Sequence, residues 1–375
     1  MSTRGKLALS DTKRRYIIKS QIIMNNLFSE RFKSARILNG FSLQGLADAL
    51  GNKISRQALH KYEKGEVIPD SEMISHLSQV LHVQPDFFFR DVKIELGNLE
   101  FRKLAKLPVK EQKKIIEHTK DVLSRYLELE GILGLETSFK NPLKDFPVIS
   151  SFEDIEKAIL EVRKSWNLGL APISNSIELL EDNHIKVVLA KSEDGFDGIQ
   201  TWLNKTIPII VINESKLKTA DRIRFTALHE LGHLLLPLGD LTEKQKEKFC
   251  NQFAAAMLMP KTIIQGEMGI SRKKLYLQEL GELKKQYGIS IQALIYRCKD
   301  LNIISESLLN QLMFIISRNG WKAKEPIEYI GAEKSNRFTQ LLFRALAEDL
   351  ISMSKAAALS NQSLLSFRKQ IINVQ

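Results

Sequence analysis

The stretch Phe225–His233 has the sequence FTALHELGH, with its two histidines four residues apart in a helical pattern. Residues four apart lie one turn apart on the same face of a helix, so His229 and His233 can bind one metal ion through their imidazoles. Glu230 lies beside that face, where its carboxylate can take a proton from an attacking water. A catalytic zinc site also needs a third protein ligand and an open position, which these nine residues do not supply.

The next predicted helix, near residues 243–259, offers the missing ligand. Glu247 begins the stretch EKFCNQFA, and Asn251 follows it one turn later on the same face. We expect Glu247 to complete the zinc site with His229 and His233, and Asn251 to hydrogen-bond one of the two rings from behind. An isolated HExxH motif is weak evidence for a zinc site, because it also arises by chance. The alternative is a zinc ion that serves only structure or sensing, and the intact motif glutamate argues against it.

These residues are similar to the ImmA/IrrE metallopeptidase family. Its members have an arginine-rich approach, then RFTxxHELGH, ExxANxFA and a terminal LMP. This chain has DRIRFT over residues 221–226, ExxCNxFA from Glu247 with Cys250 in place of alanine, and LMP over residues 258–260. The similarity covers roughly residues 150–265. It implies a gluzincin-like zinc metallopeptidase that relieves repression by cutting a partner protein. The candidates for the oxyanion donor are Arg222, Arg224 and residues past 265.

The N-terminal part of the chain, residues 28–90, has the pattern of short helices joined by tight turns. Gly40 ends the first helix, and Ser42 and Ser55 can cap the second and third helices. Phe87–Phe89 are expected to seal the small core. The sequence therefore predicts a compact all-α domain ahead of the metal-binding region.

This tract resembles the lambda-repressor/Cro-type (XRE) helix-turn-helix family over its whole length. The matching positions are Arg36, Gly40, Leu46-Ala47, Gly51, Glu63-x-Gly65 and Pro69. The resemblance implies that Arg36 pairs with Glu63, and that the domain binds double-stranded operator DNA as a homodimer. The alternative is a helix-turn-helix used only for protein contacts.

The third helix carries the side chains suited to reading bases. A recognition helix needs short or forked polar groups at its N-terminal end to reach the major groove. Arg56 can bind guanine, Gln57 can bind adenine, and Ser55 and Lys61 can bind phosphate or a base. The family's usual glutamine at the second position of helix two is absent, and Gln44 is the candidate replacement for its phosphate contact.

Composition limits the classes of function. The net charge of +11 indicates a polyanion partner, and the first 33 residues are especially basic. This basic stretch is a solvated tail or an arm near phosphates, unless translation starts at Met24. We expect no membrane partner, because no apolar run is long enough to span a bilayer. Two cysteines cannot form a disulfide framework, so a reducing cytoplasm is the expected location.

We predict a mainly α, multidomain chain with an α+β, zincin-like central domain whose small sheet precedes the HExxH helix. The expected strands are Ile185–Ala190, Gly198–Leu203 and Ile207–Asn213, with a turn at Asn204-Lys205. The predicted segments are a basic tail (1–27), the helix-turn-helix domain (28–92), a helical connector (93–147), the metallopeptidase-like domain (148–268) and a C-terminal helical region (269–375).

The two modules together predict a DNA-binding transcriptional regulator whose Zn²⁺-dependent peptidase cleaves a repressor or another regulatory protein. The strand Gly198–Leu203 is expected to form a cleft edge that pairs with extended substrate. One alternative is an antitoxin-like or effector-sensing repressor whose zincin-like domain binds a toxin or another partner without turnover. Another is an enzyme whose helix-turn-helix makes only protein contacts.

Overall fold

The computed structural model describes residues 24–91, 94–97, 107–136, 138–193 and 195–371 of the 375-residue chain. The chain divides into two compact units, each built from separate stretches. Unit 1 takes in Met1–Ile94, Leu107–Glu136 and Phe338–Gln375, and unit 2 takes in Glu95–Lys106 and Thr137–Arg337. The five sequence segments proposed above stay a prediction, and residues 1–23 of the basic tail lie outside the described residues.

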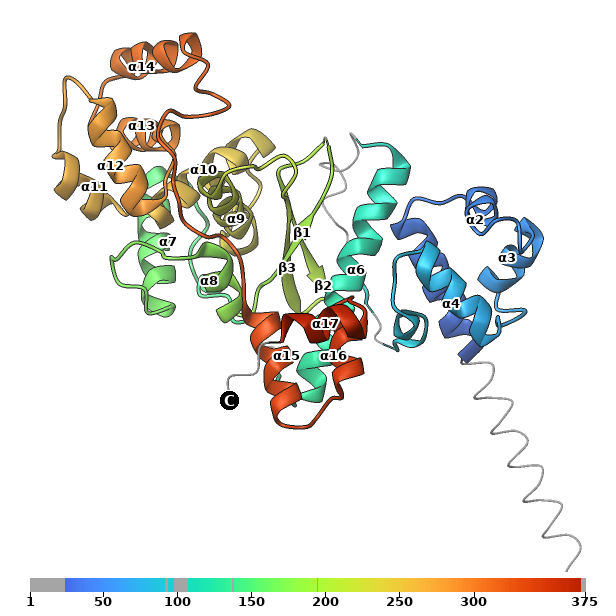
Figure 1. Ribbon diagram of the computed structural model, residues 1–375. Helices are drawn as coiled ribbons and strands as arrows, with labels where there is room; N and C mark the ends of the chain where they lie inside the picture. Colours follow the sequence, from blue (N-terminus) through green and yellow to red (C-terminus); the bar gives the residue numbers. More distant parts are fainter. Residues whose placement is uncertain (1–23, 92–93, 98–106, 137, 194, 372–375) are drawn as a thin grey trace, which may run out of the picture. The chain divides into compact units, whose positions relative to one another are not determined.

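The N-terminal part of unit 1 is a bundle of short helices (Figure 1). It consists of a helix at residues 24–38, α2 (Leu43–Ala49), α3 (Arg56–Glu63), α4 (Ser71–Val80) and the 3₁₀ helix η1 (Pro85–Phe89). Both predicted caps are confirmed, because the Ser42 hydroxyl accepts from the Gly45 amide and the Ser55 hydroxyl accepts from the Ala58 amide. These caps satisfy backbone donors that have no partner inside their own helices.

Aromatic residues fill the core of this bundle. Phe28, Phe32 and Phe88 are fully buried, and the rings of Phe28 and Phe32 stack with centroids 5.9 Å apart. The prediction for Phe87–Phe89 holds for the first two residues. Phe89 is 38% exposed and its ring lies at the edge of the cluster, so it does not seal the core. A 3₁₀ helix has three residues per turn, so three consecutive side chains point in three directions and one is left toward solvent.

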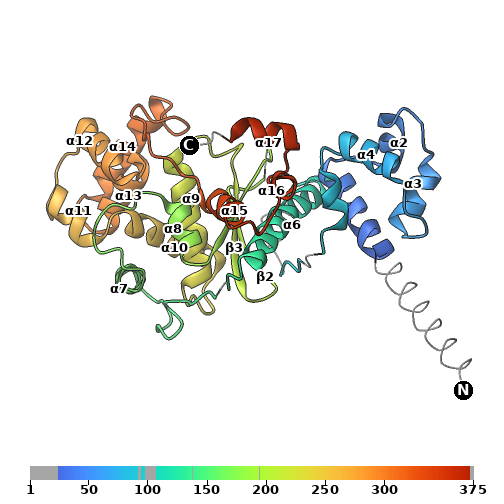
Figure 2. The ribbon, with the colours of Figure 1, turned by 60° about the horizontal axis from the view of Figure 1, so that its bottom comes forward.

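The rest of unit 1 is built from α6 (Val109–Ile132) together with α15 (Arg337–Ala347), α16 (Met353–Leu359) and α17 (Leu364–Gln370). More than 200 residues separate α6 from the three C-terminal helices in the sequence. Tyr126 and Leu129 of α6 share one apolar cluster with Leu341, Leu342 and other residues of the C-terminal helices. Figure 2 shows the C-terminal helices beside α6.

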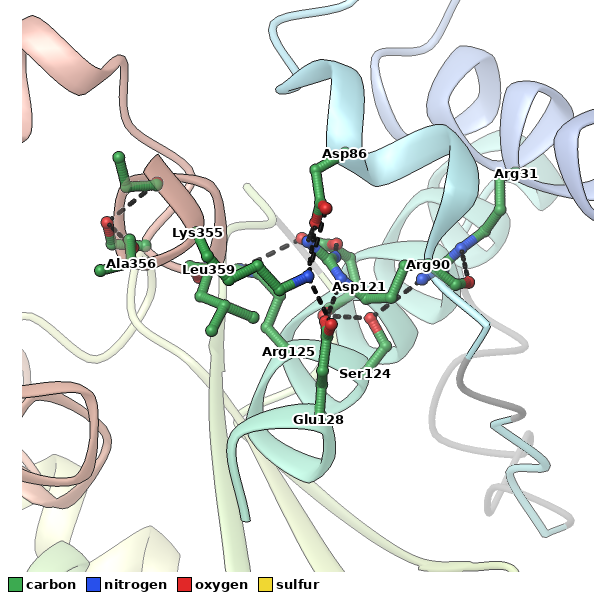
Figure 3. Close-up of polar contacts among 12 residues, drawn as sticks. Arg31, Asp86, Arg90, Asp121, Ser124, Arg125, Glu128, Lys355, Ala356 and Leu359 are labelled. Carbon is green, nitrogen blue, oxygen red and sulfur yellow. Dashed lines mark hydrogen bonds and ion pairs between the residues drawn. The ribbon is translucent and has the colours of Figure 1, made fainter. Parts of the chain in front are cut away.

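A polar cluster joins η1, α6 and α16 within unit 1 (Figure 3). Arg90 is buried and its guanidinium contacts Glu128 at 2.9 Å and Asp121 at 3.2 Å. Lys355 of α16 pairs with Glu128 at 2.5 Å and with Asp86 at 3.1 Å. Each buried charge therefore faces opposite charges, which offsets the free energy of removing it from water.

Unit 2 contains a three-stranded sheet of β1 (Lys186–Ala190), β2 (Gly198–Leu203) and β3 (Ile207–Asn213), in the order β1-β3-β2. β3 runs parallel to β1 and antiparallel to β2, and every residue of β3 is buried. Asn204 and Lys205 have positive φ values of 50° and 62°, as the tight turn from β2 into β3 requires. The predicted strands and turn are confirmed.

Unit 2 also contains the helices α7 (Phe152–Ser165), α8 (Ser176–Asp182), α9 (Ala220–Leu235), α10 (Glu243–Leu258), α11 (Lys261–Met268), α12 (Leu277–Tyr287), α13 (Ile291–Asp300) and α14 (Glu306–Arg318). α9 packs against β2 and β3, and α10 packs against α9 and α7. The predicted fold class, mainly α with one small sheet, is confirmed. None of the helices in the described part of the chain is long and apolar enough to cross a membrane.

Candidate metal centre and nucleic-acid interface

The three predicted ligands meet between α9 and α10. His229 Nε2 lies 3.2 Å from Glu247 Oε2, and His233 Nε2 lies 3.3 Å from Glu247 Oε1. The two Nε2 atoms are 3.2 Å apart, and one potential ligand atom from each residue lies within 4.8 Å of the others. The sequence pattern placed the histidines on one turn, but only the packing of two helices brings the carboxylate to them.

Gly232 explains how α10 comes so close to α9. A Cβ atom added at Gly232 would lie 3.3 Å from the Cα, Cβ and Sγ atoms of Cys250. A larger residue on either helix would push the helices apart. The glycine inside the HELGH motif and the small residue before Asn251 therefore set the helix spacing that lets Glu247 reach the histidines.

Asn251 holds one of the two rings. Its Oδ1 atom lies 2.9 Å from His229 Nδ1. An amide oxygen can only accept a hydrogen bond, so Nδ1 of the neutral ring carries the proton and Nε2 is left with a lone pair. That lone pair points to the same place as His233 Nε2 and Glu247. The predicted contact between Asn251 and a ligand histidine is present in the structure.

Glu230 lies against the first residue of β2. Its side chain is buried, and a Cβ atom added at Gly198 would lie 2.8 Å from Glu230 Cγ and 3.1 Å from Glu230 Oε1. A glycine at the start of a strand marks a close approach of another group, and here that group is the glutamate of the HExxH motif. Sequence reasoning missed this contact, although the glycine itself was a visible signal.

The outer edge of β2 carries a second feature that the sequence did not predict. The Trp202 carbonyl accepts from the Gly97 amide at 2.7 Å, and the Asn204 amide donates to the Glu95 carbonyl at 2.8 Å. Residues 95–97 therefore pair with the end of β2 that lies farther from Glu230. Alternate residues of a strand share a direction, so the backbone groups of Gly198 face the same outer edge as Trp202.

The donor set fits zinc. Two imidazole nitrogens and one carboxylate converge from two rigid helices, which is the ligand set of one class of catalytic zinc site. The hydrogen bond behind His229 orients its ring as zinc ligands are usually oriented. His229, His233 and Glu247 would hold the ion, and Glu230, the residue after His229 on α9, does not belong to this set.

The two arginines proposed as oxyanion donors have other contacts. Arg224 is fully buried, and its guanidinium bonds to the Ile173 carbonyl and the Tyr329 hydroxyl and lies 3.4 Å from Glu333. The Arg222 guanidinium donates to the Lys322 carbonyl at 2.5 Å. Both side chains thus fasten the segment after α14 to α9.

In unit 1, α3 presents the side chains selected as base-reading candidates. Arg56, Gln57 and Lys61 are all exposed on this helix. Arg36 Nε and Glu63 Oε1 lie 2.6 Å apart, so the ion pair predicted across the domain is confirmed. This pair fixes the end of α3 against the first helix, and the exposed face of α3 remains available to a partner.

The other two candidate DNA contacts already take part in local hydrogen bonds. Ser55 accepts from the Ala58 amide at 3.2 Å as the cap of α3, and its hydroxyl can still donate. Gln44 is exposed on α2 and donates from Nε2 to Asp48 Oδ1 at 2.9 Å. The Gln44 amide can turn toward a phosphate only by giving up that bond.

Two family models match the chain. Residues 32–88 match the model of the helix-turn-helix family, and residues 181–299 match the model of the IrrE N-terminal-like domain, a peptidase family of type M78. The chain joins a helix-turn-helix domain to an IrrE N-terminal-like domain. The second match takes in both helices of the metal centre and extends to α13, beyond the predicted limit near residue 265.

A curated relative is known from Bacillus subtilis (strain 168), the SPbeta prophage-derived uncharacterized HTH-type transcriptional regulator YonR. It is 42% identical to this chain over 64 residues, which are 17% of this chain and 57% of that protein. The chain therefore spans little more than half the length of the relative. The stretch that matches the IrrE N-terminal-like domain, residues 181–299, contains His229, Glu230, His233, Glu247 and Asn251.

Proposed function

We propose that the protein is a DNA-binding transcriptional regulator whose IrrE N-terminal-like domain is a zinc-dependent peptidase. The convergence of His229, His233 and Glu247 on one point, with Glu230 next to His229 in the chain of α9, carries the proposal. A purely structural zinc site needs no glutamate next to its ligands, whereas hydrolysis needs a base at that place.

The DNA-binding half rests on unit 1. Arg56, Gln57 and Lys61 stand exposed on α3, and the chain carries a net charge of +11. We infer that α3 enters the major groove of an operator, with Arg56 and Gln57 reaching base edges and Lys61 and Gln44 near phosphates. Binding as a homodimer would place two copies of α3 about 34 Å apart on successive turns of DNA.

The peptidase half assigns one task to each residue. When bound, zinc supplies Lewis-acid activation of water and of the scissile carbonyl. Glu230 takes the proton of the attacking water and later passes it to the departing amine. Asn251 keeps the His229 ring in the tautomer that leaves Nε2 free to bind the ion.

The substrate is expected to bind as an extended strand at the Gly198 end of β2, because residues 95–97 already pair with the other end. The backbone of Gly198 faces the outer edge of the sheet and touches Glu230, so a strand added at this edge would run past the catalytic carboxylate. A DNA-bound regulator meets other regulators at the same operator. We therefore propose a repressor or another regulatory protein as the substrate.

Three measurements on the full chain test the proposal. Elemental analysis should find about one zinc per chain, and gel-shift assays should find binding to DNA upstream of its own gene. Purified zinc-loaded protein should cleave a regulatory protein encoded nearby. Glu230→Gln should keep zinc and DNA binding and lose cleavage, whereas Glu243→Gln, at an exposed position of α10, should behave as wild type.

The outcomes distinguish the proposed function from its alternatives. A protein that retains no zinc when His229 and His233 are intact would refute the peptidase half and leave a DNA-binding regulator. If Glu230→Gln left both regulation and partner binding unchanged, the antitoxin-like alternative would replace proteolysis. Loss of operator binding in Arg56→Ala with Gln57→Ala is expected, and its absence would contradict the DNA-reading role of α3.

A further inference from the structure

We propose that a groove beside the metal centre is a substrate subsite that takes one apolar side chain together with a peptide N–H. The inference rests on the proposed peptidase function and names the chemistry of its substrate. The groove encloses about 620 Å³ between α10, α13 and α14, and Glu247 and Asn251 lie in its wall. A residue bound here would therefore sit directly beside the metal ligands.

The wall of the groove combines polar and charged residues with a set of apolar ones. Phe225, Ala255, Ala293 and Leu309 line it, and Ala255 and Leu309 are both buried. Phe225 lies one turn before His229 on α9, so the apolar surface begins at the metal centre and continues away from it. An aliphatic side chain placed between these residues would lose most of its contact with water.

A polar group in the wall lacks a partner. Only 6% of the Gln252 surface is exposed, and its Oε1 atom has no hydrogen-bond donor among the described residues. The side chain of Gln252 bonds to the Asp300 carboxyl group. An ionised carboxylate can only accept, so the amide nitrogen of Gln252 donates this bond and its oxygen is left without a donor. Buried acceptors in proteins are nearly always paired.

A peptide supplies both missing parts. Its side chain fills the apolar space and its backbone N–H donates to Gln252 Oε1, after a small adjustment that opens the buried oxygen to the groove. An aliphatic molecule without an N–H donor would leave the oxygen unpaired. The groove thus selects a large aliphatic residue, such as leucine, next to the bond that is cut.

The test uses three hydroxamates on the zinc-loaded full chain, with dissociation constants from calorimetry. The first has an isobutyl side chain on a succinyl core and ends in an N-methylamide. The second lacks the isobutyl group, and the third ends in an N,N-dimethylamide, which has no N–H. We expect the first to bind about tenfold more tightly than the second. We also expect about a tenfold preference for the first over the third.

Variants locate the contacts. Ala293→Phe fills the groove and should remove the preference for the isobutyl group, while Ala171→Phe, at an exposed position outside the groove, should keep it. Gln252→Leu should abolish only the preference for the N–H, because the acceptor is gone. Thermal melts by circular dichroism check that each variant is folded.

Equal binding of the first two hydroxamates to the wild type would overturn the inference. Equal binding of the first and third would mean that the N–H does not reach Gln252, which overturns the hydrogen bond. If no hydroxamate binds, the proposed metal centre fails, and a metal-free arm then decides the groove. In that arm, saturation-transfer NMR measures binding of N-acetyl-leucine N-methylamide to the protein. Transfer from the wild type that is lost in Ala293→Phe supports the subsite, and absence of transfer from the wild type refutes it.

Discussion

Removing the hydrogen bond behind His229 should weaken zinc binding without disturbing the fold. The bond joins His229 Nδ1 and Asn251 Oδ1 over 2.9 Å, and Asn251 lies on the exposed face of α10. Asn251→Ala creates no cavity, and alanine is the better helix former at an exposed position. The change therefore acts on the orientation and tautomer of one ring and leaves the packing of the helices intact.

The size of the effect follows from what else holds the ring. Loss of a hydrogen bond behind a ligand histidine costs about ten- to hundredfold in metal affinity. His229 is only 9% exposed, so packing keeps much of its orientation and the loss should be near the lower end of that range. We expect zinc to bind about tenfold more weakly to Asn251→Ala, which corresponds to about 1.4 kcal/mol.

The assay is competition between the metal-free protein and a chromophoric chelator at neutral pH. Asn251→Asp keeps an acceptor oxygen and should bind zinc within about threefold of the wild type. Asn319→Ala removes an asparagine whose side-chain amide donates to the Ile315 carbonyl of its own helix, far in the sequence from the metal centre, so it should have no effect. His233→Ala should lose tight binding. If Asn251→Ala matches the wild type while His233→Ala fails, the proposed role of Asn251 is wrong.

Three further predictions concern other parts of unit 2. Gly198→Ala should retain zinc but cut proteolysis by about a hundredfold, because the new Cβ would lie 2.8 Å from Glu230 Cγ; wild-type turnover would contradict this. Cys250 and Cys298 are buried, and burial raises the pKa of Cys298 to about 12, so a thiol reagent at pH 8 should react with both only after unfolding. Hydrogen bonds from serine backbone and hydroxyl groups at the start of α7 lower the pKa of Asp154 to about 2. The charged Asp154 should therefore stabilise the fold fully above about pH 4, and this effect should disappear toward pH 2. Denaturant melts of the wild type and Asp154→Asn at several pH values measure it, and a difference in the free energy of unfolding that does not change with pH would contradict the prediction.

Local patterns were enough to predict the elements of the metal centre. The spacing of His229 and His233 places them on one turn because a helix repeats every 3.6 residues. The short strands were visible as β-branched runs separated by Asn204-Lys205. The caps at Ser42 and Ser55 follow from the hydrogen bonds that helix ends need, which depend on only three or four residues.

Contacts between distant residues could not be predicted in the same way. The meeting of Glu247 with the histidines needs the close crossing of α9 and α10, which depends on Gly232 facing Cys250. The pairing of residues 95–97 with β2 joins positions more than 100 residues apart and has no sequence pattern of its own. The unpaired oxygen of Gln252 is visible only when its neighbours are in place.

The C-terminal third shows most clearly which features local sequence predicts and which depend on tertiary contacts. Its helices were expected as one helical region, because each carries a local periodic pattern and few breakers. Only tertiary contacts assign α11–α14 to unit 2 and α15–α17 to unit 1. By itself, the sequence determined the two modules, their helices and strands, and the chemistry of the metal ligands, because these depend on short-range spacing. The tertiary structure decided which distant side chains meet, because such contacts depend on how whole elements pack, and packing is a property of many residues together.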